Sequence, residues 1–193
     1  MEKVIDKIYY QIATDRHYKV GDKFEFGENL NNKMYDRAYN EVFRLQDLRL
    51  SDFVMDKKVT TKNKEALAKK LENYDNAIKE LAIEEVRKEH FSECPSRLHC
   101  MFLSDSKEIV MENLQDFAKR GNGTYFQAVA VKLNGKIFKA GDVYMSREGQ
   151  SYSYYKEKAY KYWSQTNVEN VKEILFEGTA EIVEILGETS TKN

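Results

Sequence analysis

Alternating hydrophobic and polar positions predict strands in several parts of the chain. The segment KIYYQIAT, residues 7–14, is rich in aromatic and β-branched side chains and is typical of a strand. VGDKFEFG alternates in part and predicts a short second strand, and LHCMFLS at 98–104 predicts a third. TYFQAVAVKL and KIFKAG flank Asn134-Gly135, a pair that favours a type I′ turn, so we predict a hairpin there. The run VKEILFEGTAEIVEIL predicts two further strands on either side of Gly178.

Apolar residues spaced three or four apart predict the helices. Residues 32–46 form one such segment, and residues 64–90 form a long amphipathic one with charges on its other positions. We expect another helix over about 106–119, begun by Asp105 and Glu108 as a capping box, and a tyrosine-rich helix over 151–165. The apolar stripe of the long helix consists of Leu67, Leu71, Tyr74, Ile78, Leu81 and Val86.

Strands and helices follow one another irregularly along the chain. This order is typical of an α+β fold and differs from the regular alternation of a parallel βαβ sheet. We therefore predict mostly antiparallel central sheets with flanking helices. The length of 193 residues suits one domain, residues 1–193, with a helical insertion around residues 32–90.

Charge and composition narrow the classes of partner. The net charge is −1, from 31 basic and 32 acidic side chains, so no global field draws the protein to nucleic acid or to an anionic membrane. The start MEKVIDK is charged, unlike a secretory signal, and no apolar run is long enough to span a membrane. Two cysteines fit a reducing compartment. We expect a cytoplasmic protein without a membrane partner.

Most motifs of known chemistry are missing from the sequence. No phosphate-binding loop, dinucleotide-binding glycine motif, nucleophile elbow or zincin motif occurs. His90, Cys94, His99 and Cys100 lie close together, but adjacent residues on a strand point to opposite faces, so we predict no metal site. The tyrosines of residues 151–165 could stack on nucleic-acid bases, although the buried face of a helix explains them more simply.

Arg97 lies between the single proline of the chain and the predicted strand at 98–104. Three interpretations are open for it. It could be a solvated loop cation, a salt-bridge partner, or an arginine that holds an anionic ligand where a strand leaves the core. The third interpretation has a chemical basis, because a guanidinium binds a phosphate through paired hydrogen bonds that a lysine cannot reproduce.

Three separated segments carry a resemblance to a known family: YYQIAT, PSRLHCMFLSDS and VKEILFEGTAEIVEIL. In order and content they resemble bacterial and phage-type proteins of uncharacterised function, in which the first segment usually reads Tyr-Tyr-His-Ile. The resemblance covers most of the chain, apart from about residues 30–65. That family looks related to the ADP-ribosyltransferase fold, and a role in a phage or in host defence would suit such a protein.

The resemblance implies a site for NAD⁺ built from an early, a middle and a late strand. The early position falls on Gln11, next to Tyr10. The middle position falls on Ser104 or Ser106, and the late, acidic position falls on Glu173. Tyr10, Gln11, Ser104 and Ser106 would then bind the NAD⁺, together with Arg97, which would contact a phosphate or position the target.

The same resemblance implies a reaction, the transfer of ADP-ribose to a macromolecular target, either a protein or a nucleic acid. Breaking the nicotinamide–ribose bond develops positive charge on the ribose, and a carboxylate such as Glu173 would stabilise that charge. Gln11 departs from the histidine of the family and cannot carry charge. The alternative is therefore a non-enzymatic module with a decayed transferase site that binds a nucleotide or a protein.

Overall fold

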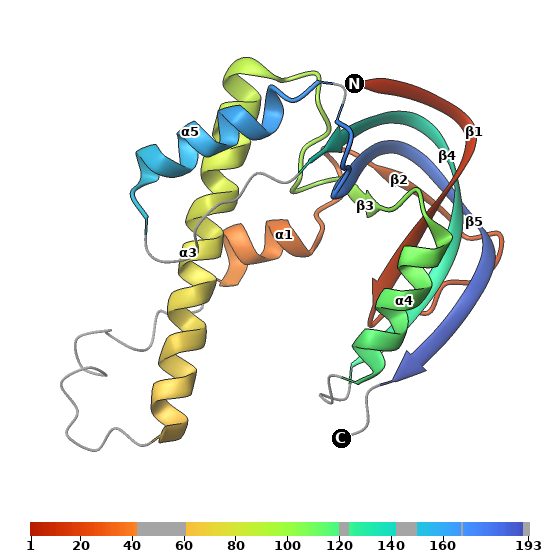
Figure 1. Ribbon diagram of the computed structural model, residues 1–193, viewed down its shortest axis with the longest axis horizontal. Helices are drawn as coiled ribbons and strands as arrows, with labels where there is room; N and C mark the ends of the chain where they lie inside the picture. The colour runs from red at the N-terminus through yellow and green to blue at the C-terminus, as the bar shows by residue number, and fades with distance from the viewer. Residues whose placement is uncertain (42–60, 120–123, 142–149, 167, 191–193) are drawn as a thin grey trace. The chain divides into compact units, whose positions relative to one another are not determined.

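The computed structural model describes residues 1–41, 61–119, 124–141, 150–166 and 168–190 (Figure 1). The chain forms two compact units. Unit 1 consists of Met1–Leu30, Glu93–Asp142 and Asn167–Asn193, and unit 2 consists of Asn31–Ser92 and Val143–Thr166. Unit 2 thus includes the segment predicted as a helical insertion, together with residues from later in the chain. A single domain with an insertion stays a prediction.

Unit 1 is built on an antiparallel sheet that combines long, curved strands with two short ones (Figure 1). Its strands are β1 (Glu2–Thr14), β2 (Lys23–Phe26), β3 (Met101–Leu103), β4 (Tyr125–Ala140) and β5 (Glu173–Ser190). They lie in the order β1-β4-β5-β2, and β3 pairs with β5 on the same edge as β2. All pairings among the described strands are antiparallel, which confirms the predicted α+β class.

The sheet curves until two of its strands meet. Ser104, which follows β3, pairs with Tyr10 of β1. The Tyr10 N–H donates to the Ser104 carbonyl at 2.9 Å, and the Ser104 N–H donates to the Tyr10 carbonyl at 2.8 Å. The pairing therefore runs from β1 through β4, β5 and β3 back to β1. This closed circuit brings the early, middle and late parts of the sequence together.

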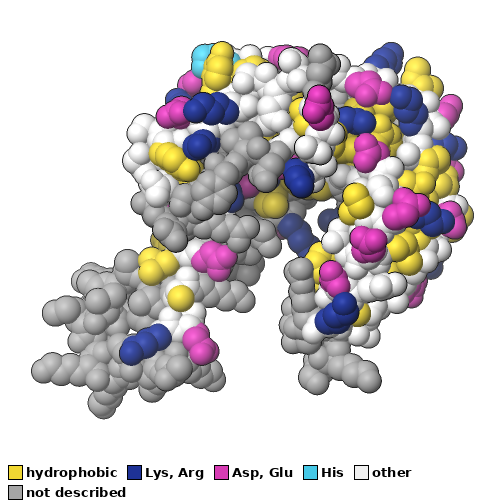
Figure 2. Space-filling view, viewed as in Figure 1, with side chains coloured by type: hydrophobic (Ala, Val, Ile, Leu, Met, Phe, Trp, Pro, Cys, Tyr) yellow, Lys and Arg dark blue, Asp and Glu magenta, His cyan; other side chains and the backbone are white. Residues whose placement is uncertain are grey.

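The core of unit 1 has two parts. The main cluster includes Tyr9, Val131, Leu133, Ile137 and Phe176, each at most 5% exposed. Helix α4 (Lys107–Ala118) packs a second cluster against the sheet through Val110 and Leu114. On the face of unit 1 seen in Figure 2, basic and acidic side chains are interspersed, in keeping with ion pairs such as Lys132–Glu181 at 3.1 Å.

The predicted hairpin at Asn134-Gly135 is wrong, because both residues lie inside the continuous strand β4. A Cβ atom on Gly135 would lie 2.2 Å from the Glu177 carbonyl oxygen and 2.9 Å from the Cα of Gly178. The two glycines are cross-strand partners, so they allow the backbones of β4 and β5 to approach closely. The predicted break near Gly178 is also wrong, since β5 continues through it with a φ of 135°.

Neighbouring β1 bends at the same level of the sheet. Its register shifts between Val4 and Lys7, and Asp6 has a φ of 50°. The side chain of Asn134 holds this bend, because its Oδ1 accepts from the Asp6 N–H at 3.1 Å and its Nδ2 donates to the Asp6 carboxylate at 3.2 Å. Asn134 and Gly135 therefore support a bend in β1 and a close contact between β4 and β5, where the sequence predicts a turn.

Unit 2 is helical in its described residues. It contains α1 (Lys33–Tyr35), the π-helix η1 (Asp36–Glu41), α3 (Thr61–His90) and α5 (Tyr152–Trp163). The predicted helices at 64–90 and 151–165 are confirmed, while the part of the 32–46 prediction after residue 41 lies outside the described residues. None of the described helices combines the length and the apolarity that crossing a membrane requires.

The predicted apolar stripe of α3 is only partly right. Leu71 and Ile78 are 48% and 40% exposed, whereas Ala77, Ile83 and Val86 are buried. The buried face also includes an ion pair, in which Arg87 Nε and Nη2 donate to the two oxygens of Glu84 at 3.0 and 2.8 Å. Pairing explains how these charges tolerate burial, and a pattern of apolar residues alone does not predict it.

The tyrosine-rich helix α5 packs within unit 2. Tyr155, Tyr162 and Trp163 are at most 4% exposed, and the Trp163 Nε1 donates to the Ile83 carbonyl at 2.9 Å. The Tyr155 hydroxyl donates to Asp75, and burial together with this carboxylate raises the pKa of Tyr155 to about 12. The buried tyrosines of α5 therefore pack inside unit 2, in agreement with the simpler of the two interpretations of the sequence.

The close approach of Gly135 and Gly178 predicts the effect of adding one methyl group. Gly135→Ala would place Cβ against backbone atoms of β5, so we expect the free energy of unfolding to fall by about 3 kcal/mol. Gly187→Ala on β5 is the matched control, because its Cβ would lie 3.2 Å from the flexible end of Leu114. Urea unfolding measures both variants, and equal losses would contradict the role of the bend.

Candidate functional site

A pocket of about 420 Å³ lies where the pairing circuit of unit 1 closes. We call it the Glu173 pocket. β1 contributes Tyr10–Ile12, the end of β3 contributes Phe102–Asp105, and the start of β5 contributes Val171–Ile174. The wall from α4 consists of Ile109, Val110, Asn113 and Phe117. All three sequence segments that carry the family resemblance therefore border one pocket.

Strand register places three of the expected site residues in one row. Leu103 pairs with Ile174, and continuing this antiparallel register by one step puts Ser104 opposite Glu173. Ser104 also pairs with Tyr10. Since directly paired residues point to the same face of a sheet, Tyr10, Ser104 and Glu173 share a face.

Gln11 lines the same pocket, but its side chain belongs to the other face of β1. Successive residues of a strand alternate, and both Tyr9 and Ala13 lie in the main core, whereas Tyr10 and Ile12 pack against the α4 cluster. The Oε1 atom of Gln11 is buried, with no hydrogen-bond partner among the described residues. The structure thus brings the side chain of Tyr10, rather than that of Gln11, to the face of Glu173.

Arg97 forms an ion pair with Glu173. The side chains are 11% and 29% exposed, and the Arg97 guanidinium lies 5.3 Å from the centre of the Phe102 ring. Arg97 is not among the described residues that line the Glu173 pocket, although Phe102 and Glu173 are. Of the three interpretations of Arg97, the salt bridge is therefore observed in the structure, and a ligand contact stays a prediction.

Ser106 has a structural task at the start of α4. It is the N-cap, since its Oγ accepts from the Ile109 N–H at 3.2 Å, and it donates to the Glu108 carboxylate at 2.9 Å. The backbone N–H of Glu108 and this hydroxyl lower the pKa of Glu108. The sequence predicts Asp105 as the cap, whereas the structure places the cap one residue later, at Ser106. Ser104 lines the Glu173 pocket, and Ser106 is absent from its described lining.

Sequence reasoning missed several residues of the Glu173 pocket. Asp105 lines it and forms an ion pair with Lys139 at 3.3 Å. Asn113 reaches it from the middle of α4, and Lys172 from the residue before β5. Nothing in the local sequence marks these positions, because they meet only through the pairing of β3 with β1 and β5.

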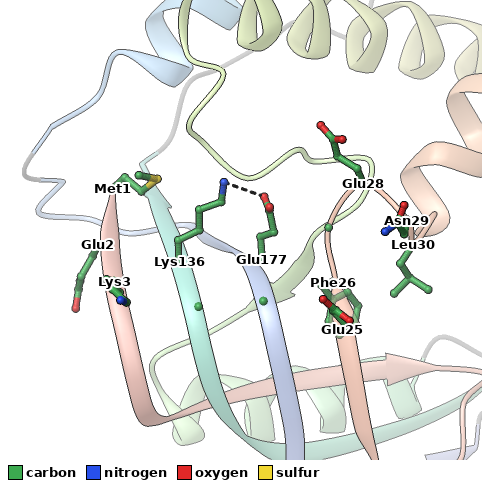
Figure 3. Close-up of a pocket in the computed structure, with 13 residues that line it drawn as sticks. Met1, Glu2, Lys3, Glu25, Phe26, Glu28, Asn29, Leu30, Lys136 and Glu177 are labelled. Atoms are coloured by element: carbon green, nitrogen blue, oxygen red, sulfur yellow. Dashed lines mark ion pairs between the residues drawn. The ribbon is translucent and has the colours of Figure 1, made fainter.

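A second pocket, of about 880 Å³, lies at the bend of the sheet (Figure 3). All four strands of the β1-β4-β5-β2 path contribute to it, and Gly135 and Gly178 are part of its lining. Lys136 and Glu177 point toward each other in Figure 3, with Nζ and Oε2 at 3.2 Å, and Lys136 also donates to the Glu93 carbonyl at 3.0 Å. None of the site residues expected from the sequence lines this pocket in the described part of the chain.

Comparison with known proteins identifies a family. A family model described as "Protein of unknown function (DUF2441)" matches residues 9–188. This range includes every residue that lines the Glu173 pocket. No curated protein matches the chain.

The capping role of Ser106 predicts the effect of its substitution. Ser106→Ala removes an N-cap, so we expect the free energy of unfolding to fall by about 1 kcal/mol, and Ser106→Asp should retain most of the stability because aspartate also caps helices. Thermal or urea unfolding measures the change. If Ser106→Ala and Ser106→Asp were equally destabilised, the capping role would be wrong.

Proposed function

From the premise that the chain belongs to the DUF2441 family of proteins of unknown function, we propose that it binds NAD⁺ or a related nucleotide in the Glu173 pocket. We further propose that it transfers ADP-ribose from NAD⁺ to a macromolecular target: the nicotinamide–ribose bond breaks, nicotinamide leaves, and a nucleophilic group of the target forms the new bond to the ribose. One observation carries the proposal. Tyr10, Ser104 and Glu173 come from three distant parts of the sequence and border one pocket.

The properties of the pocket support a ligand with an apolar body and polar edges. Phe102, Val110 and Phe117 supply apolar walls, while Ser104 and Asn113 supply polar groups. A volume of about 420 Å³ lies within the usual range for small-molecule sites. A ring such as a nucleobase or nicotinamide could pack against the aromatic walls, with its ribose near the carboxylate.

Glu173 is the residue for which we propose a catalytic role. As the nicotinamide–ribose bond breaks, the ribose gains positive charge, and a fixed carboxylate lowers the energy of that state more than that of the bound nucleotide. The ion pair with Arg97 would fix the orientation of this carboxylate. Glu173 lines the pocket and remains 29% exposed, so a ligand can reach it.

A binding module without catalysis is the second candidate, and the position of Gln11 favours it. The early position has no charged group, and the side-chain oxygen of Gln11 is buried away from the face of Glu173. Such a protein would bind the nucleotide and leave the glycosidic bond intact. Measuring binding and nicotinamide release on the same samples separates the two candidates.

Glu173→Gln tests the catalytic role. If Glu173 stabilises the charge on the ribose, this change should lower nicotinamide release from NAD⁺ by at least about a hundredfold while the protein stays folded. Release is measured by chromatography, with and without candidate protein and nucleic-acid targets.

Glu184→Gln is the matched control for this substitution. Glu184 lies on the same strand, is 58% exposed and pairs with Lys107 at 3.6 Å, and it is not part of the described lining of the pocket. Its activity should equal that of the unmodified protein. Binding of NAD⁺ without release by the unmodified protein would support the binding module, and failure to bind any nucleotide would reject both candidates.

A further inference from the structure

The two carboxylates that line the Glu173 pocket are paired with cations, and one lining lysine remains available to a ligand. Three charged residues are among the described residues that line it: Asp105, Lys172 and Glu173. Asp105 pairs with Lys139 at 3.3 Å, and Glu173 pairs with Arg97. Neither Lys139 nor Arg97 belongs to that lining, so each lining carboxylate is neutralised from outside the pocket.

Lys172 is the remaining charge. It is exposed, and the described residues include no hydrogen bond or ion pair of its side chain. Its backbone is fixed, because the Lys172 N–H donates to the Ala140 carbonyl at 2.8 Å and joins the start of β5 to the end of β4. The residue thus offers an exposed ammonium group from an anchored position at the pocket wall.

Arg97 is less available to a ligand than Lys172. Its side chain is only 11% exposed, its guanidinium is engaged by Glu173, and Phe102 lies beside it. Glu173 lines the pocket and Arg97 is not among its described lining, so Glu173 is the member of the ion pair that a ligand in the pocket contacts. An anion that competed with Glu173 for Arg97 would displace the group proposed to act on the ribose.

We infer that Lys172 binds the anionic group of the ligand in the Glu173 pocket, and that Arg97 is a positioning residue that acts through Glu173. This inference rests on the proposed function and assigns two of its roles. The ligand class is a molecule with an apolar ring and a phosphate. Lysine suits this task as a point charge on a flexible stem, whereas the planar arginine suits a fixed pair with a carboxylate.

Titration calorimetry with ADP-ribose tests the role of Lys172. Loss of a charged hydrogen bond should weaken binding by at least about tenfold in Lys172→Ala, and Lys172→Arg should recover most of the affinity because it keeps the charge. Lys132→Ala is the matched control, since Lys132 lies on β4, pairs with Glu181 and is not among the described lining residues. Its affinity should change less than twofold.

A double variant tests the role of Arg97. Arg97→Met alone leaves the Glu173 carboxylate unpaired beside the ligand, so ADP-ribose should bind at least about tenfold more weakly by repulsion. Arg97→Met combined with Glu173→Gln replaces the ion pair by a neutral pair. If Arg97 acts only through Glu173, the double variant should bind within about twofold of the unmodified protein. Thermal unfolding checks that each variant is folded.

The outcomes separate this inference from the proposed function. Unchanged affinity in Lys172→Ala, or a tenfold loss in the double variant, would overturn the assignment of these roles while nucleotide binding stands. If the unmodified protein binds neither ADP-ribose nor NAD⁺, the proposed function fails, and the roles of Lys172 and Arg97 fail with it.

Discussion

The contact between Gly135 and Gly178 is the constraint on which the rest of unit 1 depends. A side chain on either residue would collide with the backbone of the other strand, at 2.2 Å for Gly135 and 2.4 Å for Gly178. The absence of side chains lets β4 and β5 approach closely, and Asn134 ties the bend of β1 to the same level of the sheet. A sheet that bends in this way can curve far enough for its outer strands to meet.

The candidate site follows from that curvature. Tyr10 lies on the first strand of the path, and Ser104 follows a strand at the opposite edge of β5, yet the two exchange backbone hydrogen bonds. In a flat sheet, β4 and β5 would separate them. The pocket therefore exists only when the sheet has closed, and its two carboxylates, Asp105 and Glu173, are balanced by Lys139 and Arg97 from outside its described lining. Geometry and electrostatics of the site both depend on the complete fold.

Local patterns in the sequence predict where helices and strands lie better than they predict how the strands pair. The periodicity of residues 64–90 and the aromatic and β-branched residues near Tyr10 reflect short-range physics, and both elements are present. Asn134-Gly135 misleads because the same two residues suit a type I′ turn and a close backbone contact, and only the partner strand decides between them. Glu173 could be singled out by resemblance. Lys172 could not be singled out in this way, because its proposed role depends on the ion pairs that already neutralise the neighbouring carboxylates.

The position of β5 has a consequence for the order in which the protein is assembled. β5 is the most highly connected strand, because it pairs with β4 on one edge and with β2 and β3 on the other. It also follows all of them along the chain. A ribosome therefore releases β2, β3 and β4 before the strand that joins them exists, and their edges stay open until residues 173–190 emerge. Folding of unit 1 therefore has to wait for residues 173–190 and should be slow for its size. Until these residues have emerged, the exposed strand edges carry the greatest risk of aggregation.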